Sequence, residues 1–234
     1  MWILDNLETR GAMKDKVWLR NTKTYDRAMF KPDMEDESER SIIFYQVCTH
    51  LGIDCAKTEL YEYMGKKGCL SYDVGHKRLI ANEGAELDIK SGSSIISGKT
   101  NVSYAELEPS LSERVKIKFA DMVYADVLLR NTDRHSGNFK LLLDRNGTIV
   151  DLLGLYDNDE ILRERMSELS YFRWDTEISE TLYEVICKPY RVFPDRIREL
   201  IGKSTDLPSS ISYYDKIMQR LDNIKKSIKL IKLE

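Results

Sequence analysis

The chain has 234 residues, a length typical of one large domain or of two lobes packed together. Hydrophobic residues make up 42% of it and charged residues 32%, which excludes disordered and collagen-like proteins and predicts a buried core. The net charge of −3 provides no overall positive field for binding nucleic acid or an anionic membrane. There is no long apolar run and no apolar leader, so we expect a soluble, cytoplasmic protein.

The first part of the chain has the pattern of a small sheet with one helix. Four short segments rich in aromatic and β-branched residues predict strands, at 16–20, 25–31, 58–64 and 69–74. Asp36 and Glu39 have the spacing of a capping box, and the apolar positions after them predict a helix that ends at Gly52. We expect four strands and one helix here.

The second part is predominantly helical. Apolar residues spaced three and four apart predict a long helix over 111–130 and another along the tail from Ile217 to Ile231. Between them, segments 139–143 and 148–153 flank an Asn-Gly turn and predict a β-hairpin.

A constellation of polar residues follows the long helix. Asp133 and Asn138 lie five residues apart in a polar loop, and the hairpin then leads to Asp157. Phosphoryl transfer from ATP needs a carboxylate to accept the proton of the attacking hydroxyl and hard oxygen ligands to hold magnesium against the phosphates. Asp133 suits the first role, and Asn138 and Asp157 suit the second.

The motifs resemble those of a known family. NTDRHSGNF followed by LLGLYDND resembles the NxDRHxxN and PLYDN motifs of HipA-like serine/threonine kinases, which are relatives of the kinases in bacterial toxin-antitoxin modules. YADVLLR is similar to the family's helix into that loop, and GAMKDKVWL and AMFKP are similar to its glycine loop and ATP-binding Lys-Pro. The resemblance covers most of residues 9–160. The DRHxxN pattern is also shared with phosphoinositide-type lipid kinases.

The resemblance implies an α+β, protein-kinase-like fold with two lobes. The N-terminal lobe would span residues 1–73 with a sheet and one helix, and the mostly helical catalytic lobe would span residues 74–234. ATP and magnesium would bind in the cleft between them.

The resemblance also implies roles for residues of the first lobe. Lys31 would bind the α and β phosphates, and Glu39 would pair with Lys31 from the helix. Two alternatives remain open for Glu39. Its carboxylate could belong to the capping box, and the pairing position could instead be that of Glu37 or Ser41.

Further nucleotide contacts follow from the same resemblance. The segment that holds Thr9 and Gly11 would cover the phosphates, and Thr9 is the candidate for an inhibitory autophosphorylation. Leu70 and Tyr72 would form the hinge that binds adenine through backbone groups. His135 is interpreted as a structural imidazole rather than an acid or base, because Asp133 already supplies the carboxylate.

The magnesium site departs from the family pattern. Relatives commonly read YDNGSSLG, whereas this chain reads YDNDEIL, so Asp159 adds a charge beside Asp157. In an extended segment residues 157 and 159 point to the same side, which makes Asp159 a competitor for the metal. We expect Asp157 to be the main ligand because it lies within the matching motif.

The expected function is an ATP-dependent serine/threonine kinase that acts on itself and on a cellular protein, possibly a component of translation. An antitoxin-like protein is a candidate partner, although the chain has no room for the extra N-terminal subdomain of the full-length toxin kinases. Two alternatives are a nucleotide-binding pseudokinase that acts through protein contacts, and a small-molecule or lipid kinase. Neither direct nucleic-acid binding nor a membrane is expected.

Overall fold

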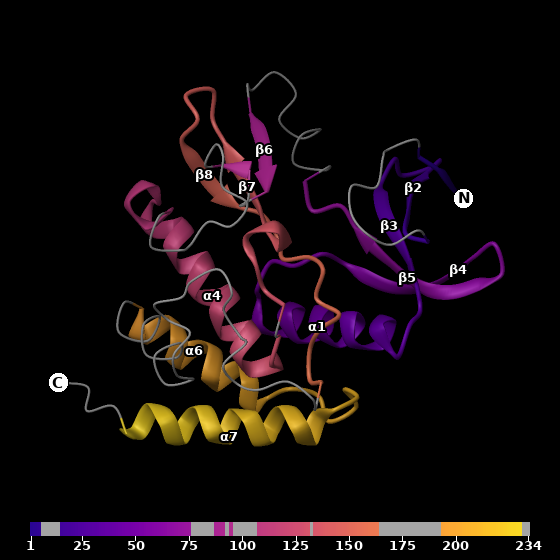
Figure 1. The fold of residues 1–234 in the computed structure, drawn as a ribbon. Coiled ribbons are helices and arrows are strands. Elements are labelled where there is room, and N and C mark those ends of the chain that lie inside the picture. The colour runs from indigo at the N-terminus through magenta and orange to yellow at the C-terminus, as the bar shows by residue number, and fades with distance from the viewer. Residues whose placement is uncertain are drawn as a thin grey trace.

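The computed structural model describes residues 1–5, 15–75, 87–91, 94–95, 107–131, 133–163 and 193–230. Its first element is an antiparallel five-stranded sheet in the order β1-β2-β3-β5-β4 (Figure 1). The strands are β1 (Trp2–Leu4), β2 (Val17–Asn21), β3 (Arg27–Pro32), β4 (Thr58–Tyr63) and β5 (Lys66–Tyr72). The four strands expected from the sequence are confirmed, and β1 adds a fifth at the edge beside β2.

Helix α1 (Glu37–Leu51) follows β3 and ends at Gly52, as expected. Gly52 has a φ of 74°, the left-handed conformation in which glycine pays no steric cost. The capping box is not formed, because the Asp36 side chain makes no cap hydrogen bond. Instead the backbone N–H of Ser38 donates to the Asp33 carboxylate at 3.1 Å.

The second half contains α4 (Glu113–Leu129), α6 (Pro194–Thr205), α7 (Tyr214–Leu230) and a three-stranded sheet. In that sheet β7 (Lys140–Leu143) lies between β8 (Ile149–Leu152) and β6 (Asp88–Ser91). The expected hairpin and the two long helices are confirmed, whereas β6 was not expected. Two short 3₁₀ helices, η2 (Glu108–Ser110) and η3 (Ser136–Asn138), precede α4 and β7.

One large hydrophobic core joins the two halves of the molecule. Helix α1 lies between the five-stranded sheet and helices α4, α6 and α7 (Figure 1). Its buried residues Phe44, Val47 and Leu51 belong to the same core as α4. Helix α1 packs on the helical half as well as on the sheet. A shift of this helix would therefore change the packing in both halves of the molecule.

The segment after β8 returns to the five-stranded half. Leu155 forms an isolated parallel bridge with Cys55, and a Cβ atom at Gly154 would lie 3.1 Å from the Cα of Cys55. A side chain at position 154 would therefore require the Cys55 backbone to shift by a few tenths of an ångström. The bridge fixes the chain two residues before Asp157. Within the described residues, no helix has the length and apolar character needed to cross a bilayer.

Candidate active site

The loop that carries Asp133 is fixed to the end of α4. Arg130 ends the helix in a left-handed conformation, with a φ of 51°. The buried Asn131 donates from Nδ2 to Asp126 at 2.9 Å, and its Oδ1 accepts the backbone N–H of Asp133 at 3.2 Å. The side chain of Asp133 is 43% exposed. A hydrogen bond therefore holds the backbone of Asp133, and its carboxylate is accessible, as a general base requires.

A buried ion pair lies beneath this loop. Arg134 and Asp126 are fully buried and are joined by two hydrogen bonds, of 2.8 Å and 3.0 Å. Burial alone would lower the pKa of Arg134, but the charge and hydrogen bonds of Asp126 raise it above its usual value. Arg134 also donates to the backbone oxygen of Asn138 at 2.9 Å and to Oδ1 of Asn158 at 2.5 Å. One guanidinium thus connects the loop of Asp133 to the Asp157 segment.

Replacing Arg134 by Met is expected to lower the free energy of unfolding by about 3–5 kcal/mol, because Asp126 would be left buried and unpaired. Urea unfolding measures the change. The control is Arg198→Met, which removes an exposed pair with Asp195 and should cost about 0–1 kcal/mol. Equal losses in the two variants would contradict the assigned role of Arg134.

Lys31 and Asp157 meet although 126 residues separate them in sequence. Lys31 is the last residue but one of β3 and only 6% of its surface is exposed. Its Nζ donates to Oδ1 of Asp157 and, at 3.3 Å, to Oδ2 of Asp159. Asp157 has a φ of 56°, which is uncommon for a residue other than glycine and is frequent at functional sites.

The charges in this cluster shift each other's protonation. Burial alone would lower the pKa of Lys31, but Asp157 and Asp159 raise it well above its usual value. Burial alone would raise the pKa of Asp157, but the charges of Lys31 and Lys16 lower it. The ammonium and the Asp157 carboxylate are therefore both charged at neutral pH.

Replacing Lys31 by Met is expected to lower the free energy of unfolding most at neutral pH. In the parent, the lowered pKa of Asp157 gives stability above about pH 4, the region of the unfolded-state pKa, and this stability is lost as the pH falls through the folded-state pKa. Without Lys31, burial raises the pKa of Asp157, so the variant regains stability on acidification.

Urea titrations between about pH 7 and about pH 3 measure the difference between parent and variant, which should shrink as the pH falls. A constant difference would show that Lys31 does not pair with these carboxylates in solution.

Asn138 is connected to Asp133. It is 3% exposed at the end of η3, and its Nδ2 donates to the backbone oxygen of Asp133 at 2.9 Å. An Asn138 amide oxygen with the carboxylates of Asp157 and Asp159 would be a hard-oxygen donor set that suits magnesium. Within the described residues, no group of three or more His, Cys, Asp or Glu side chains could hold a metal ion.

The expected pair between Glu39 and Lys31 does not form within the described residues. Glu39 is exposed on α1, and the carboxylates that bind Lys31 are those of Asp157 and Asp159. Glu37, the rival candidate, lies 3.5 Å from Arg163, and burial and the charge of Asp159 raise its pKa. The inward position next to Glu39 is held by Arg40, which sequence reasoning missed.

The adenine hinge expected at Leu70 and Tyr72 stays a prediction, and the pairing of its strand weighs against the part of it that falls on Leu70. Leu70 and Tyr72 lie in β5, which is flanked by β3 and β4. The Tyr72 backbone N–H donates to the oxygen of Lys57 at 2.9 Å, and its hydroxyl donates to Glu59 at 2.7 Å. Sheet pairing on both sides occupies the backbone groups of this strand, so Leu70 is poorly placed to bind adenine through them.

The remaining expectations have separate outcomes. Thr9 and Gly11 lie outside the described residues, and their expected contacts with phosphate stay a prediction. The Nδ1 atom of His135 accepts the backbone N–H of Gly137 at 3.0 Å, and its Nε2 lies 4.0 Å from Asp133. This local hydrogen bond fits the structural role expected for His135.

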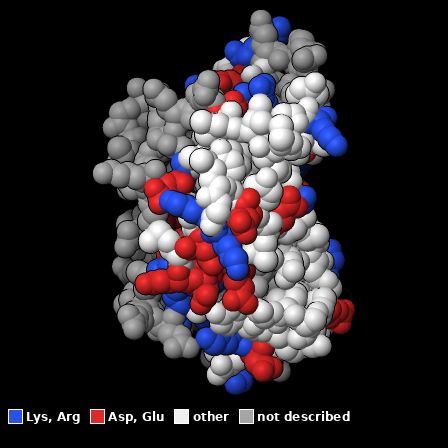
Figure 2. Space-filling model, turned by 90° about the vertical axis from the view of Figure 1, so that its right-hand side faces the viewer, with Lys and Arg blue, Asp and Glu red and all other residues white. Residues whose placement is uncertain are grey.

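A cavity of about 380 Å³, open to solvent, lies beside the Lys31 cluster. Its charged lining residues are Asp15, Lys16, Asp33, Glu37, Lys66 and Lys67. Lys16 lines the cavity, and its Nζ lies 3.9 Å from Oδ1 of Asp157, which brings the cavity next to the ion pair. Figure 2 shows acidic side chains, with lysine and arginine side chains among them, on the side of the molecule that lies to the right in Figure 1. The charged side chains that line the cavity are three acidic and three basic, so its lining has no excess of either sign.

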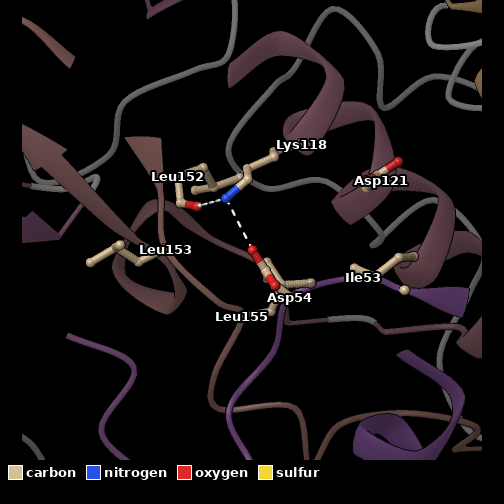
Figure 3. Close-up of a pocket in the computed structure, with 8 residues that line it drawn as sticks. Ile53, Asp54, Lys118, Asp121, Leu152, Leu153 and Leu155 are labelled. Atoms are coloured by element: carbon tan, nitrogen blue, oxygen red, sulfur yellow. Dashed lines mark hydrogen bonds and ion pairs between the residues drawn. The ribbon is translucent and has the colours of Figure 1, made fainter. Parts of the chain in front are cut away.

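A smaller cavity of about 60 Å³ lies between α4 and the loop after α1 (Figure 3). Lys118 points into it and donates to Asp54 at 3.0 Å and to the backbone oxygen of Leu152 at 3.2 Å. The cation that lines this cavity is thus already bound by the protein, and we assign the cavity no chemistry.

Comparison with known proteins supports the fold. No family model matches the chain, and no curated protein matches its sequence. Among solved structures, the Helicobacter pylori proinflammatory kinase CtkA matches with a TM-score of 0.55 and 16% identity, over 92% of this chain and 95% of that chain. HipA of the Shewanella oneidensis MR-1 toxin-antitoxin system, solved with HipB and operator DNA, matches with a TM-score of 0.45 and 10% identity, over 98% of this chain and 67% of that chain. The match to CtkA shows that the chain has the α+β fold of that kinase, in agreement with the fold that its resemblance to HipA-like kinases implied.

Proposed function

We propose that the protein is an ATP- and magnesium-dependent kinase that transfers the γ-phosphoryl group to serine or threonine hydroxyls, on itself and on a cytoplasmic protein. The observation that carries the proposal is the contact of Lys31 with Asp157, two residues that occupy the phosphate-binding and metal-binding positions of the kinase pattern. The hydrogen bond from Asn138 to the backbone oxygen of Asp133 supports the proposal, because this bond connects the second metal-binding position to the proposed base.

Each residue would have one role in the reaction. Lys31 would exchange its carboxylate partners for the α and β phosphates when the nucleotide binds. Asp157 and Asn138 would hold magnesium, which supplies neutralisation of phosphate charge when bound. Asp133 would orient the acceptor hydroxyl and take its proton as the oxygen forms its bond to the γ-phosphorus, while the bond to ADP breaks.

A pseudokinase is the second candidate, favoured by one observation. Lys31 lacks the expected α1 carboxylate among the described residues and is bound by Asp157 and Asp159, which the nucleotide must displace. Such a protein would bind a nucleotide and act through contacts with a partner, for which an antitoxin-like protein remains a candidate.

Incubation with γ-labelled ATP, magnesium and a general protein acceptor tests the proposal. Acid hydrolysis should then release labelled phosphoserine or phosphothreonine. Nucleotide binding without labelling would support the pseudokinase. Label that enters an added lipid or small molecule, but no protein, would support a lipid kinase or a small-molecule kinase.

A further inference from the structure

Arg40 is a buried arginine near the start of α1 that none of the roles above uses. It is 7% exposed, its Nε donates to the backbone oxygen of Asp159 at 2.6 Å, and its Nη1 donates to the backbone oxygen of Glu35 at 2.6 Å. Its Nη2 is buried without a hydrogen-bond partner in the described part of the chain. Burial of a guanidinium is unfavourable unless its contacts compensate. The burial of Arg40, with only two of its nitrogens hydrogen-bonded in this way, therefore requires an explanation.

The two bonds of Arg40 connect α1 to the segment that carries the metal-binding position. The backbone oxygen of Asp159 is bound by Arg40, and the carboxylate of the same residue binds Lys31 at 3.3 Å. A physical path therefore runs from α1 through Arg40 and Asp159 to Lys31. A second and weaker link joins the same elements, because Glu37 of α1 lies 3.5 Å from Arg163.

The turn before α1 is shaped to meet this arginine. Glu35 and Asp36 have φ values of 50° and 64°, in the left-handed region that residues other than glycine rarely occupy. Such a conformation persists only when surrounding contacts hold it. The hydrogen bond from Arg40 to the oxygen of Glu35 is one contact that holds it here.

We propose that Arg40 is a positioning residue for phosphoryl transfer, which holds the segment of Asp157 and Asp159, and through it Lys31, in register with α1. The proposal rests on the proposed kinase function. It assigns to a buried arginine on α1 the coupling that the kinase pattern assigns to a carboxylate on this helix. A guanidinium suits this task because its planar donors can bind two carbonyl oxygens at once in a fixed geometry, whereas a lysine ammonium is a flexible point charge.

The test compares Arg40→Met and Arg40→Lys with a control on the same helix. Val47→Ala removes volume from the core that α1 shares with α4, so it destabilises the helix without touching the site. All proteins are assayed at a temperature where circular dichroism shows them folded. The kinetic readouts are kcat, the KM for ATP and the magnesium concentration at half-maximal rate.

We expect both Arg40 variants to lose about tenfold or more in kcat and to need more magnesium, because the carboxylates would no longer be held at the phosphates. Val47→Ala should keep the parent's kcat and magnesium requirement. Parent-like values in Arg40→Lys, or equal kinetic losses in the Arg40 variants and Val47→Ala, would overturn the positioning role.

A second readout does not depend on activity. Acetic anhydride labels free amines, and mass spectrometry gives the labelling rate of Lys31 relative to the exposed Lys66. The Arg40 variants should label Lys31 faster, since its carboxylate partners would be less well held. An inactive parent with faster Lys31 labelling in the variants would refute the kinase function, and with it any role in phosphoryl transfer, but would retain the finding that Arg40 holds the segment of Asp157 and Asp159 against Lys31. Unchanged labelling in folded variants would refute the positioning role alone.

Discussion

Asp133→Asn is expected to abolish phosphoryl transfer while ATP affinity and stability stay close to those of the parent. The carboxylate acts on the acceptor hydroxyl and not on the nucleotide, and removing such a base typically costs about 10²–10⁴-fold in rate. Its side chain is accessible, and its backbone is held by Asn131 and Asn138, so the amide should fit without disturbing the loop.

Single-turnover transfer rates and calorimetric titration with ATP measure the two effects for Asp133→Asn separately. His135→Gln is a useful neighbour, because the imidazole is assigned only the local hydrogen bond to Gly137 and should matter far less. If Asp133→Asn kept a rate within about tenfold of the parent, the lost barrier stabilisation would be below about 1.4 kcal/mol and Asp133 would not be the base.

The second large effect is expected at Asp157. Asp157→Ala should remove activity and most of the effect of magnesium on ATP affinity, because this residue lies within the motif that places the metal ligand and its carboxylate reaches Lys31. Asp159→Ala should do much less. Its backbone oxygen, which accepts from Arg40, is retained in the alanine variant, so the segment keeps its link to α1.

Calorimetric titration of ATP with and without magnesium compares the parent, Asp157→Ala and Asp159→Ala. The ratio of the two affinities in each protein isolates the coupling to the metal from the loss of a negative charge beside the phosphates. An unchanged ratio in Asp157→Ala would place the metal site elsewhere. A larger loss in Asp159→Ala than in Asp157→Ala would reverse the assignment of the two carboxylates.

The sequence allowed most of the regular structure to be predicted, because α4, α7, the hairpin of β7 and β8 and four strands of the first sheet have strong periodic patterns. The two strands that were missed have none. Strand β1 has three residues and exists through its pairing with β2, and β6 reads DIKS and exists through its pairing with β7. Tertiary pairing decides such segments, and local propensity does not record it.

The site was predicted less completely, and α1 shows the reason. Glu39 lies four residues before Ile43 and Arg40 lies three before it, so helical periodicity allows either to face inward. The structure buries Arg40 and exposes Glu39, a choice made by the carbonyl oxygens of Glu35 and Asp159. One of these lies 119 residues away along the chain and leaves no local signal.

The carboxylates at 157 and 159 give an intermediate case. Alternation along an extended segment predicted that both point to one side, and both do reach Lys31. The backbone is not a strand there, however, because Asp157 has a φ of 56°. The prediction was right about the side chains and wrong about the conformation that brings them together.

The central claim is that Lys31, Asp133 and Asp157 form one site for phosphoryl transfer. Intact-protein mass spectrometry after incubation with ATP and magnesium tests it most directly, with Asp133→Asn and a sample lacking magnesium beside the parent. The account predicts that the parent gains the mass of one or more phosphoryl groups and that neither comparison sample does. Equal phosphorylation of Asp133→Asn and the parent would contradict it. So would a folded parent that binds magnesium and ATP but phosphorylates neither itself nor an added acceptor protein.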